Sequence, residues 1–235
     1  MKLSYAQRLE DYYLWRGFGG LTTGFYVDIG AGHPIEDNVS YWFYLQGWTG
    51  LVVEPQPELL AAYADLRPRD LRDGSLIGRE DGEADFYVFP TLHGLSTTKR
   101  GSAEASRQYE ADYRTEQREA VTLATLLSRH RVEQIDFLKV DVEGAELDVF
   151  EGADWRRWRP RVVVGEILSP GAPDGSWRAW DRILLAQNYE CVLADDLNRY
   201  YVANEEGELK QRFPREEAPW DIVDHYWIEE EKVQR

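Results

Sequence analysis

Four acidic residues each stand at the end of a short apolar run that is typical of a buried β-strand: Asp28, Glu54, Asp141 and Glu166. The carboxyl ends of parallel strands share one edge of a sheet, where open α/β sheets bind their ligands. We therefore expect the four carboxylates to converge on one crevice. Crowded like charges raise one another's pKa values and cost stability unless cations compensate. The crevice should accordingly take a cationic ligand or a metal.

A glycine turn follows the first of these strands and narrows the choice of ligand. Gly30 and Gly32 allow a sharp turn and a close approach of the backbone to a ligand. Glu54 comes 22 residues after Gly32, which suits an acidic residue that binds ribose hydroxyls. The third glycine of the dinucleotide fingerprint is missing, and Asp28 would repel a diphosphate. A ligand with a ribose, an ammonium and a sulfonium but no phosphate fits best, and S-adenosylmethionine matches that description.

Longer motifs around these residues resemble the FkbM family of class I S-adenosylmethionine-dependent methyltransferases. The resemblance covers roughly residues 20–205 and rests on FYVDIGAG (Phe25–Gly32), VVEPQPELL (Val52–Leu60), IDFLKVDVEGAELDVFEGA (Ile135–Ala153) and RVVVGEI (Arg161–Ile167). It implies an α/β, Rossmann-like fold: a mostly parallel twisted sheet with helices on both faces and a C-terminal antiparallel hairpin. Residues 189–203 have the two-strand pattern expected of that hairpin.

We expect one principal domain with an appendage at each end. Residues 1–20 should hold an amphipathic helix, with 4–16 as its helical part, packed on the domain or forming a wall of the acceptor site. Residues 21–205 should form the methyltransferase domain. Within it, 90–120 reads as a long polar loop that could act as a lid or bind substrate. Residues 206–235 form an acidic tail that could dock on the domain or on a second subunit of a homo-oligomer.

The resemblance assigns the cofactor site residue by residue. The expected contacts are Asp28, Gly30, Ala31, Gly32, Glu54, Pro55, Gly78, Arg79 and Asp141. Gly78 and Arg79 stand where the family usually carries an adenine-contacting turn of the type Ala-x-Ser-Asp. Here that stretch reads Leu-Ile-Gly-Arg and departs from the pattern.

Methyl transfer is an in-line displacement, so holding the acceptor at near-attack distance in a dry site should supply most of the acceleration. A hydroxyl acceptor must lose its proton, so a base helps. Asp141 is the first candidate, as base or through a metal, and Glu143 the second. His33 follows the glycine turn and could face the sulfonium, although a turn histidine bonded to backbone is an equal alternative. His93 lies in HGLST, which resembles a substrate-side loop of the family.

Asp141, Glu143 and Glu166 also form a candidate metal site. Magnesium prefers a few carboxylates together with water and substrate oxygens, so a sugar diol could complete its coordination shell. A metal is an optional addition to this scheme rather than a requirement of it.

Composition limits the partners. The 235 residues include 27 Lys and Arg against 43 Asp and Glu, a formal net charge of −16. Such a surface should repel nucleic acids and anionic membranes. Cys191 is the single cysteine, so no intrachain disulfide can form. With no signal-peptide pattern and no apolar run near the roughly 18 residues of a membrane span, we expect a cytoplasmic protein.

The predicted function is methylation of a sugar hydroxyl on a bacterial glycan or a glycosylated metabolite, because the resemblance implies hydroxyl acceptors of this class. Three alternatives stay open. The same sheet could serve a nicotinamide-dependent oxidoreductase, the fold could be a non-catalytic binding protein, or the acceptor could be an amine or a carboxylate.

Overall fold

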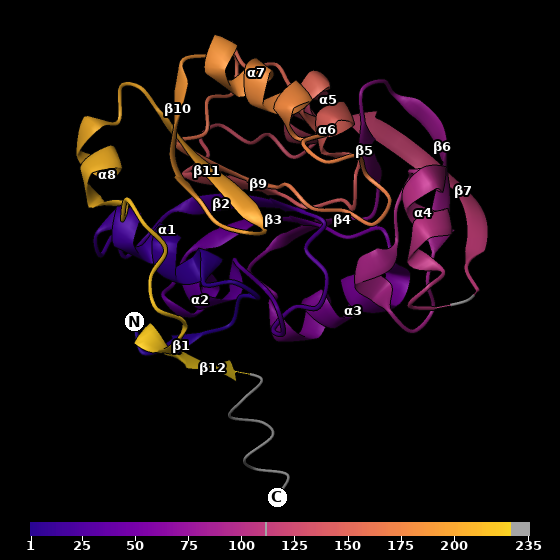
Figure 1. Ribbon diagram of the computed structural model, residues 1–235, viewed down its shortest axis with the longest axis horizontal. Helices are drawn as coiled ribbons and strands as arrows, with labels where there is room; N and C mark the ends of the chain where they lie inside the picture. Colours follow the sequence, from indigo (N-terminus) through magenta and orange to yellow (C-terminus); the bar gives the residue numbers. More distant parts are fainter. Residues whose placement is uncertain (111, 227–235) are drawn as a thin grey trace, which may run out of the picture.

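The structure is a computed structural model that describes residues 1–110 and 112–226. Its centre is a seven-stranded sheet in the order β10-β11-β9-β8-β2-β3-β4 (Figure 1). The parallel strands are β2 (Phe25–Ile29), β3 (Thr49–Val53), β4 (Leu71–Asp73), β8 (Phe137–Val140) and β9 (Val162–Glu166). The predicted terminal hairpin is confirmed, because β11 (Asn198–Ala203) runs antiparallel to both β9 and β10 (Tyr189–Ala194).

Helices cover both faces of this sheet, as the sequence predicts. One face carries α1 (Glu10–Phe18), α2 (Tyr41–Leu45) and α3 (Pro57–Leu66), and the other carries α5 (Leu123–Arg129), α6 (Glu146–Glu151) and α7 (Arg178–Ala186) (Figure 1). Side chains alternate between the two faces along each strand, so the core is divided into one cluster on each face of the sheet. In β2, Tyr26 joins an aromatic-rich cluster with α1 and α2, whereas Val27 and Ile29 join a second hydrophobic cluster under α5 and α6.

The long loop expected at 90–120 is wrong, because this segment contains a helix and a strand of a second, three-stranded sheet. Strand β7 (Arg114–Thr122) pairs with β5 (Leu76–Gly78) and β6 (Gly82–Val88). Before it come a 3₁₀ turn, η1 (His93–Leu95), and helix α4 (Arg100–Ser106). The first six residues of β7 are partly or fully exposed, so the sequence lacks the apolar alternation that marks a strand. The backbone ladder with β6 forms the strand instead.

The N-terminal helix begins later than predicted. It starts at Glu10, and Leu3–Ser4 forms a short strand, β1, that pairs with β12 (Asp224–His225). Asp11 holds the preceding turn, because its carboxylate accepts from Ser4 Oγ at 2.6 Å and from Tyr5 N at 2.8 Å. The buried side of α1 packs on the domain, as one of the two interpretations expected.

The chain beyond the hairpin contains α8 (Gly207–Arg212) and the 3₁₀ turn η2 (Trp220–Ile222). The predicted amphipathic end at 220–231 continues past residue 226, and that part lies outside the described residues. No helix within residues 1–110 or 112–226 is long and apolar enough to cross a membrane.

Candidate active site

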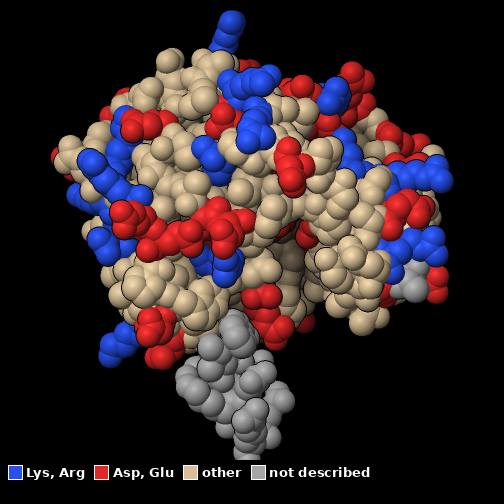
Figure 2. All heavy atoms as spheres, viewed as in Figure 1, with Lys and Arg blue, Asp and Glu red and all other residues tan. Residues whose placement is uncertain are grey.

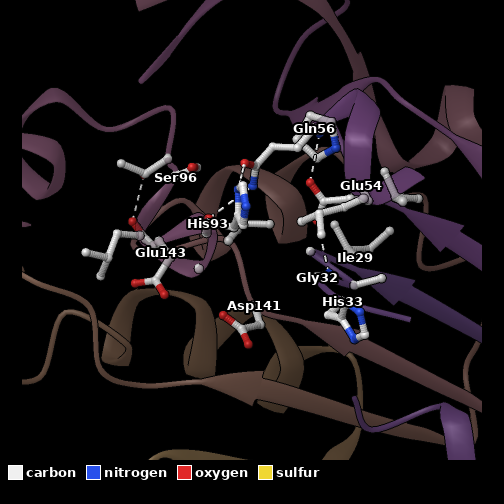
Figure 3. A pocket seen from close by; sticks show the side chains of 18 of the residues that line it. Ile29, Gly32, His33, Glu54, Gln56, His93, Ser96, Asp141 and Glu143 are labelled. Atoms are coloured by element: carbon white, nitrogen blue, oxygen red, sulfur yellow. Dashed lines mark hydrogen bonds between the residues drawn. The ribbon is translucent and has the colours of Figure 1, made fainter. Parts of the chain in front are cut away.

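A cavity of about 790 Å³ opens at the carboxyl ends of the central strands. Its walls come from the turn after β2, the segment after β3, the turn between β8 and α6, and residues 91–98 (Figure 3). In the space-filling view the surface is deeply hollowed near its centre, and acidic side chains lie beside the hollow (Figure 2). The cavity therefore lies at the sheet edge where the sequence predicts the ligand.

The glycine turn after β2 forms one wall. Gly30 has a φ of +74°, and a Cβ there would lie 1.7 Å from the carbonyl oxygen of Asp141. Gly32 has a φ of +60°, but a Cβ there would meet no protein atom within 4 Å. Gly30 thus lets two segments of the protein cross, whereas Gly32 leaves space inside the cavity. Ala31 also lines the cavity, so the whole predicted turn lies along the cavity wall.

Glu54 lies directly opposite this turn. Its Oε2 accepts from Gly32 N at 3.0 Å and its Oε1 accepts from Gln56 N at 2.8 Å. Burial raises the pKa of Glu54 to about 7, against the effect of these two backbone donors. Each carboxylate oxygen retains a lone pair, so the group can still accept from a pair of vicinal hydroxyls. Pro55 completes this part of the lining.

Asp28 lies outside the cavity, which corrects its assignment as a direct cofactor contact. It is fully buried inside β2, and strand alternation turns it toward the same face as Tyr26. There its Oδ2 accepts from Ser40 Oγ at 2.6 Å. Three of the four predicted carboxylates, Glu54, Asp141 and Glu166, do line the cavity.

Gly78 and Arg79 are also absent from the lining, because β5 leads away from the main sheet. Arg79 extends toward α6, where it forms ion pairs of 2.7 Å with Asp148 and 2.8 Å with Glu151. Ser75, Leu76 and Ile77, just before them in the chain, line the cavity instead.

A buried lysine accompanies the acidic residues, and the sequence analysis did not assign it. Lys139 Nζ lies 3.0 Å from Asp141 Oδ2 and 3.8 Å from Asp28, and it donates to the carbonyl oxygen of Gly30 at 3.0 Å. Although burial favours the neutral carboxyl, this ammonium lowers the pKa of Asp141. Lys139 precedes Asp141 by two positions in an extended segment, and that spacing is the signal that could have revealed it.

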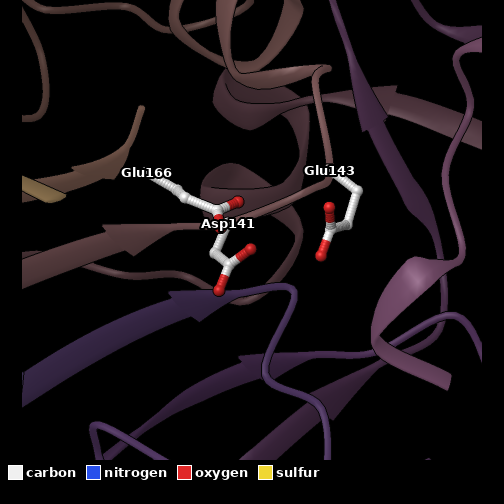
Figure 4. A group of neighbouring side chains, drawn as sticks. All are labelled: Asp141, Glu143 and Glu166. Atoms are coloured by element: carbon white, nitrogen blue, oxygen red, sulfur yellow. The ribbon is translucent and has the colours of Figure 1, made fainter. Parts of the chain in front are cut away.

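Asp141, Glu143 and Glu166 come together as the sequence predicts (Figure 4). One oxygen from each lies within 4.8 Å of the others. Burial, and then the neighbouring carboxylates, raise the pKa values of Glu143 and Glu166 well above their ordinary values. Among the described residues, Glu166 Oε2 is buried without a hydrogen-bond partner. This set of hard oxygen donors suits a divalent cation.

The turn that carries Glu143 is held from both sides. Glu143 has a φ of +54°, and Glu146 Oε1 accepts from the backbone nitrogens of Val142 and Gly144. From the other side, Thr97 Oγ1 donates to the Glu143 carbonyl at 2.8 Å. Residues 91–98 are therefore joined to the acidic turn as well as lining the cavity.

The two candidate histidines differ in what their rings contact. His33 Nδ1 accepts from the backbone nitrogens of Ile35 at 3.3 Å and Glu36 at 3.0 Å, which is the turn arrangement given as its alternative. In a neutral ring the proton then resides on Nε2. His93 Nδ1 instead lies 2.8 Å from Gln56 Oε1 (Figure 3). Both rings line the cavity.

The strand order, the single antiparallel strand next to the sheet edge and the glycine turn facing an acidic residue define a Rossmann-like fold of the class I methyltransferase type. The family model described as "Methyltransferase FkbM domain" matches residues 28–191, well over half of the chain. The chain therefore belongs to the FkbM methyltransferase family, whose methyl donor is S-adenosylmethionine.

Among solved structures, a TehB-like SAM-dependent methyltransferase from Corynebacterium glutamicum is similar at a TM-score of 0.41 and 10% sequence identity. The similarity covers 84% of this chain and 88% of that one. No curated protein sequence matches the chain.

Proposed function

We propose that the protein transfers the methyl group of S-adenosylmethionine to a hydroxyl of a sugar, on a bacterial glycan or a glycosylated metabolite. The observation that carries this proposal is a single cavity that is lined both by the glycine turn with Glu54 and by residues 91–98 with Tyr109. A donor beside the glycine turn and an acceptor beside Tyr109 can therefore meet in one cavity.

The glycine turn and Glu54 fit the donor. Glu54 keeps acceptor lone pairs for a ribose diol, and the open space at Gly32 admits close contact with the backbone. The acidic lining suits a ligand with an ammonium and a sulfonium. When bound, S-adenosylmethionine supplies a methyl group activated for displacement by its sulfonium. The protein residues orient that group and exclude water around it.

Tyr109 and Leu92 favour a neutral, hydroxylated acceptor. Tyr109 is 63% exposed and Leu92 is 43% exposed, and both line the cavity. An exposed aromatic ring offers an apolar face and a polar tip, a combination that suits a sugar ring. The carboxylates nearby disfavour a phosphorylated or carboxylated acceptor.

A divalent cation is a secondary part of the proposal. Asp141, Glu143 and Glu166 would hold it, and it would polarise the acceptor oxygen as a Lewis acid. We also expect the protein to act in the cytoplasm, where its donor is made.

Incubation with isotopically labelled S-adenosylmethionine and a panel of methyl glycosides tests the acceptor class, each with and without magnesium. Mass spectrometry of the products should show labelled methyl ethers. Matched amino sugars and uronic acids serve as controls, because methylation only at their nitrogen or carboxylate would replace the hydroxyl with another acceptor. Turnover of none of them would overturn the sugar assignment and would favour a non-catalytic role.

A further inference from the structure

His93 and Gln56 form a closed pair between two separate segments of the cavity wall. Gln56 Nε2 donates to the carbonyl oxygen of His93 at 3.0 Å, while Gln56 Oε1 lies 2.8 Å from His93 Nδ1. Gln56 is itself buried, and its backbone nitrogen bonds to Glu54. The pair thus connects the segment that follows Glu54 with residues 91–98.

This geometry determines which ring nitrogen of His93 carries the proton. A carbonyl oxygen only accepts hydrogen bonds, so the Gln56 amide must direct its NH₂ group at it. The amide oxygen then faces Nδ1, and Nδ1 must be the donor. In a neutral imidazole the other nitrogen, Nε2, consequently has a lone pair. No hydrogen bond to Nε2 is present among the described residues.

The loop that carries His93 is held in place on several sides. The backbone nitrogens of Thr91 and Leu92 donate to the Glu110 carboxylate, and Ser96 N donates to the His93 carbonyl at 3.1 Å. Thr97 forms two backbone hydrogen bonds with Tyr87 in β6. The imidazole is therefore presented on a fixed backbone.

Two of the other candidate bases are already engaged, and Glu143 stays the competitor. Asp141 bonds to the Lys139 ammonium, and His33 Nδ1 accepts from two backbone donors. A neutral His33 has its proton on Nε2, whereas a neutral His93 has its proton on Nδ1. The two imidazoles of the cavity wall are therefore opposite tautomers.

We propose that His93 Nε2 is the general base for the acceptor hydroxyl and that Gln56 is the positioning residue that fixes its tautomer. This inference rests on the proposed O-methyl transfer. As the acceptor oxygen bonds to the methyl carbon, the carbon–sulfur bond breaks and its electron pair passes to sulfur. The hydroxyl proton moves to Nε2, which leaves a methyl ether, a thioether and an imidazolium. Bulk water later takes the proton.

Nitrogen-15 NMR of the imidazole rings tests the positioning role without any acceptor. The chain has only four histidines, so the His93 and His33 signals can be assigned by substitution. We expect His93 as the Nδ1–H tautomer and His33 as the Nε2–H tautomer in the same spectrum. In Gln56→Met, His93 should lose its preference while His33 keeps its own. An Nε2–H tautomer at His93 in the unsubstituted protein, or an unchanged His93 signal in Gln56→Met, would overturn the positioning role.

Kinetics on a methyl glycoside from the acceptor panel test the base. His93→Asn keeps an N–H near the position of Nδ1 but has no counterpart of Nε2, so kcat should fall about 100-fold or more. Gln56→Met should lower kcat roughly 10-fold and leave KM nearly unchanged, since the ring is misoriented rather than lost. A cooperative urea unfolding transition in both variants verifies their folding.

Glu143→Gln is the matched comparison, because Glu143 is the competing candidate base. Retention of kcat within a few-fold in His93→Asn, together with a large loss in Glu143→Gln, would transfer the role to Glu143. If no methyl glycoside is turned over, the proposed function fails and the base assignment fails with it. The NMR result then still decides whether Gln56 sets the tautomer.

Discussion

Glu54 shows at the scale of one residue how burial prepares a polar group for a ligand. Two backbone donors hold its carboxylate, yet burial raises its pKa to about 7. Near neutral pH the ligand-free protein therefore has both the protonated and the ionised form. Ribose hydroxyls donate to the ionised form, so ligand binding and proton loss are coupled.

The coupling predicts a pH dependence of cofactor affinity. Since the bound state favours the ionised carboxylate, affinity for S-adenosylhomocysteine should rise as pH increases from about 6 to about 8. Glu54→Gln should weaken binding about 10- to 100-fold, because hydrogen bonds to a charged partner contribute about 1.5–3 kcal/mol. The variant should also lose most of the pH dependence in titration calorimetry. Exposed Glu58→Gln is the control, and an equal loss there would contradict the assignment.

At the scale of an element, the turn after β2 contains two glycines with different structural roles. Gly30 is required by the crossing of the Asp141 backbone, and Gly32 faces open space in the cavity. Because both have positive φ, alanine at either position costs about 1–2 kcal/mol of backbone strain.

Gly30→Ala should destabilise the protein by well over that amount, because its Cβ would overlap a backbone oxygen. Gly32→Ala should fold with only the strain cost, yet bind S-adenosylhomocysteine at least about 10-fold more weakly, since its methyl group would occupy ligand space. Urea denaturation and calorimetry separate the two effects. Unchanged affinity in a folded Gly32→Ala protein would show that the ligand lies elsewhere.

The sequence correctly predicts those strands that a run of apolar residues marks. The runs ending at Glu54, Asp141 and Glu166 are strands of the main sheet, and those three side chains line one cavity. Residues 114–119 form a strand through backbone pairing with β6, which leaves no apolar pattern to recognise. Gly78 and Arg79 lie outside the lining because β5 leaves the cavity after Ile77 and Arg79 pairs with α6, long-range contacts that no local signal specifies.

Contacts between distant segments explain what the sequence could not supply in the site. Gln56 and His93 are 37 residues apart, and the sequence around neither residue indicates that they pair. Asp28 could have been placed correctly from the sequence. Side chains two positions apart in a strand lie on one face, so Asp28 shares the face of the buried Tyr26 and does not face the cavity. The roles assigned to Asp141, Glu143, His33 and His93 stay predictions.

At the scale of the whole molecule, an acidic chain buries several carboxyl groups at a cost. On α1, burial raises the pKa values of both Glu10 and Asp11 to about 7. The folded state therefore holds protons that the unfolded state releases at lower pH. This contribution to stability is full below the unfolded pKa values and is lost as pH rises through about 4 to 7.

Asp11→Asn should test this linkage. The asparagine can still accept from Tyr5 N, and the Ser4 hydroxyl can turn to accept from its amide. The free energy of unfolding should exceed that of the unsubstituted protein at about pH 8, by on the order of 4 kcal/mol, and the gap should narrow toward about pH 5. Denaturant titrations across this range measure it. A gap that widens at lower pH would reverse the sign and contradict the account.

The central claim is that the cavity at the sheet edge holds S-adenosylmethionine, and thermal unfolding tests it most directly. S-adenosylhomocysteine and NAD are compared, each with and without magnesium. At 100 times its dissociation constant a ligand adds about 2.7 kcal/mol, which in a chain of this length raises the midpoint by roughly 5–10 °C. The account predicts that rise with S-adenosylhomocysteine and none with NAD. A rise with NAD alone, or with neither ligand, would contradict it.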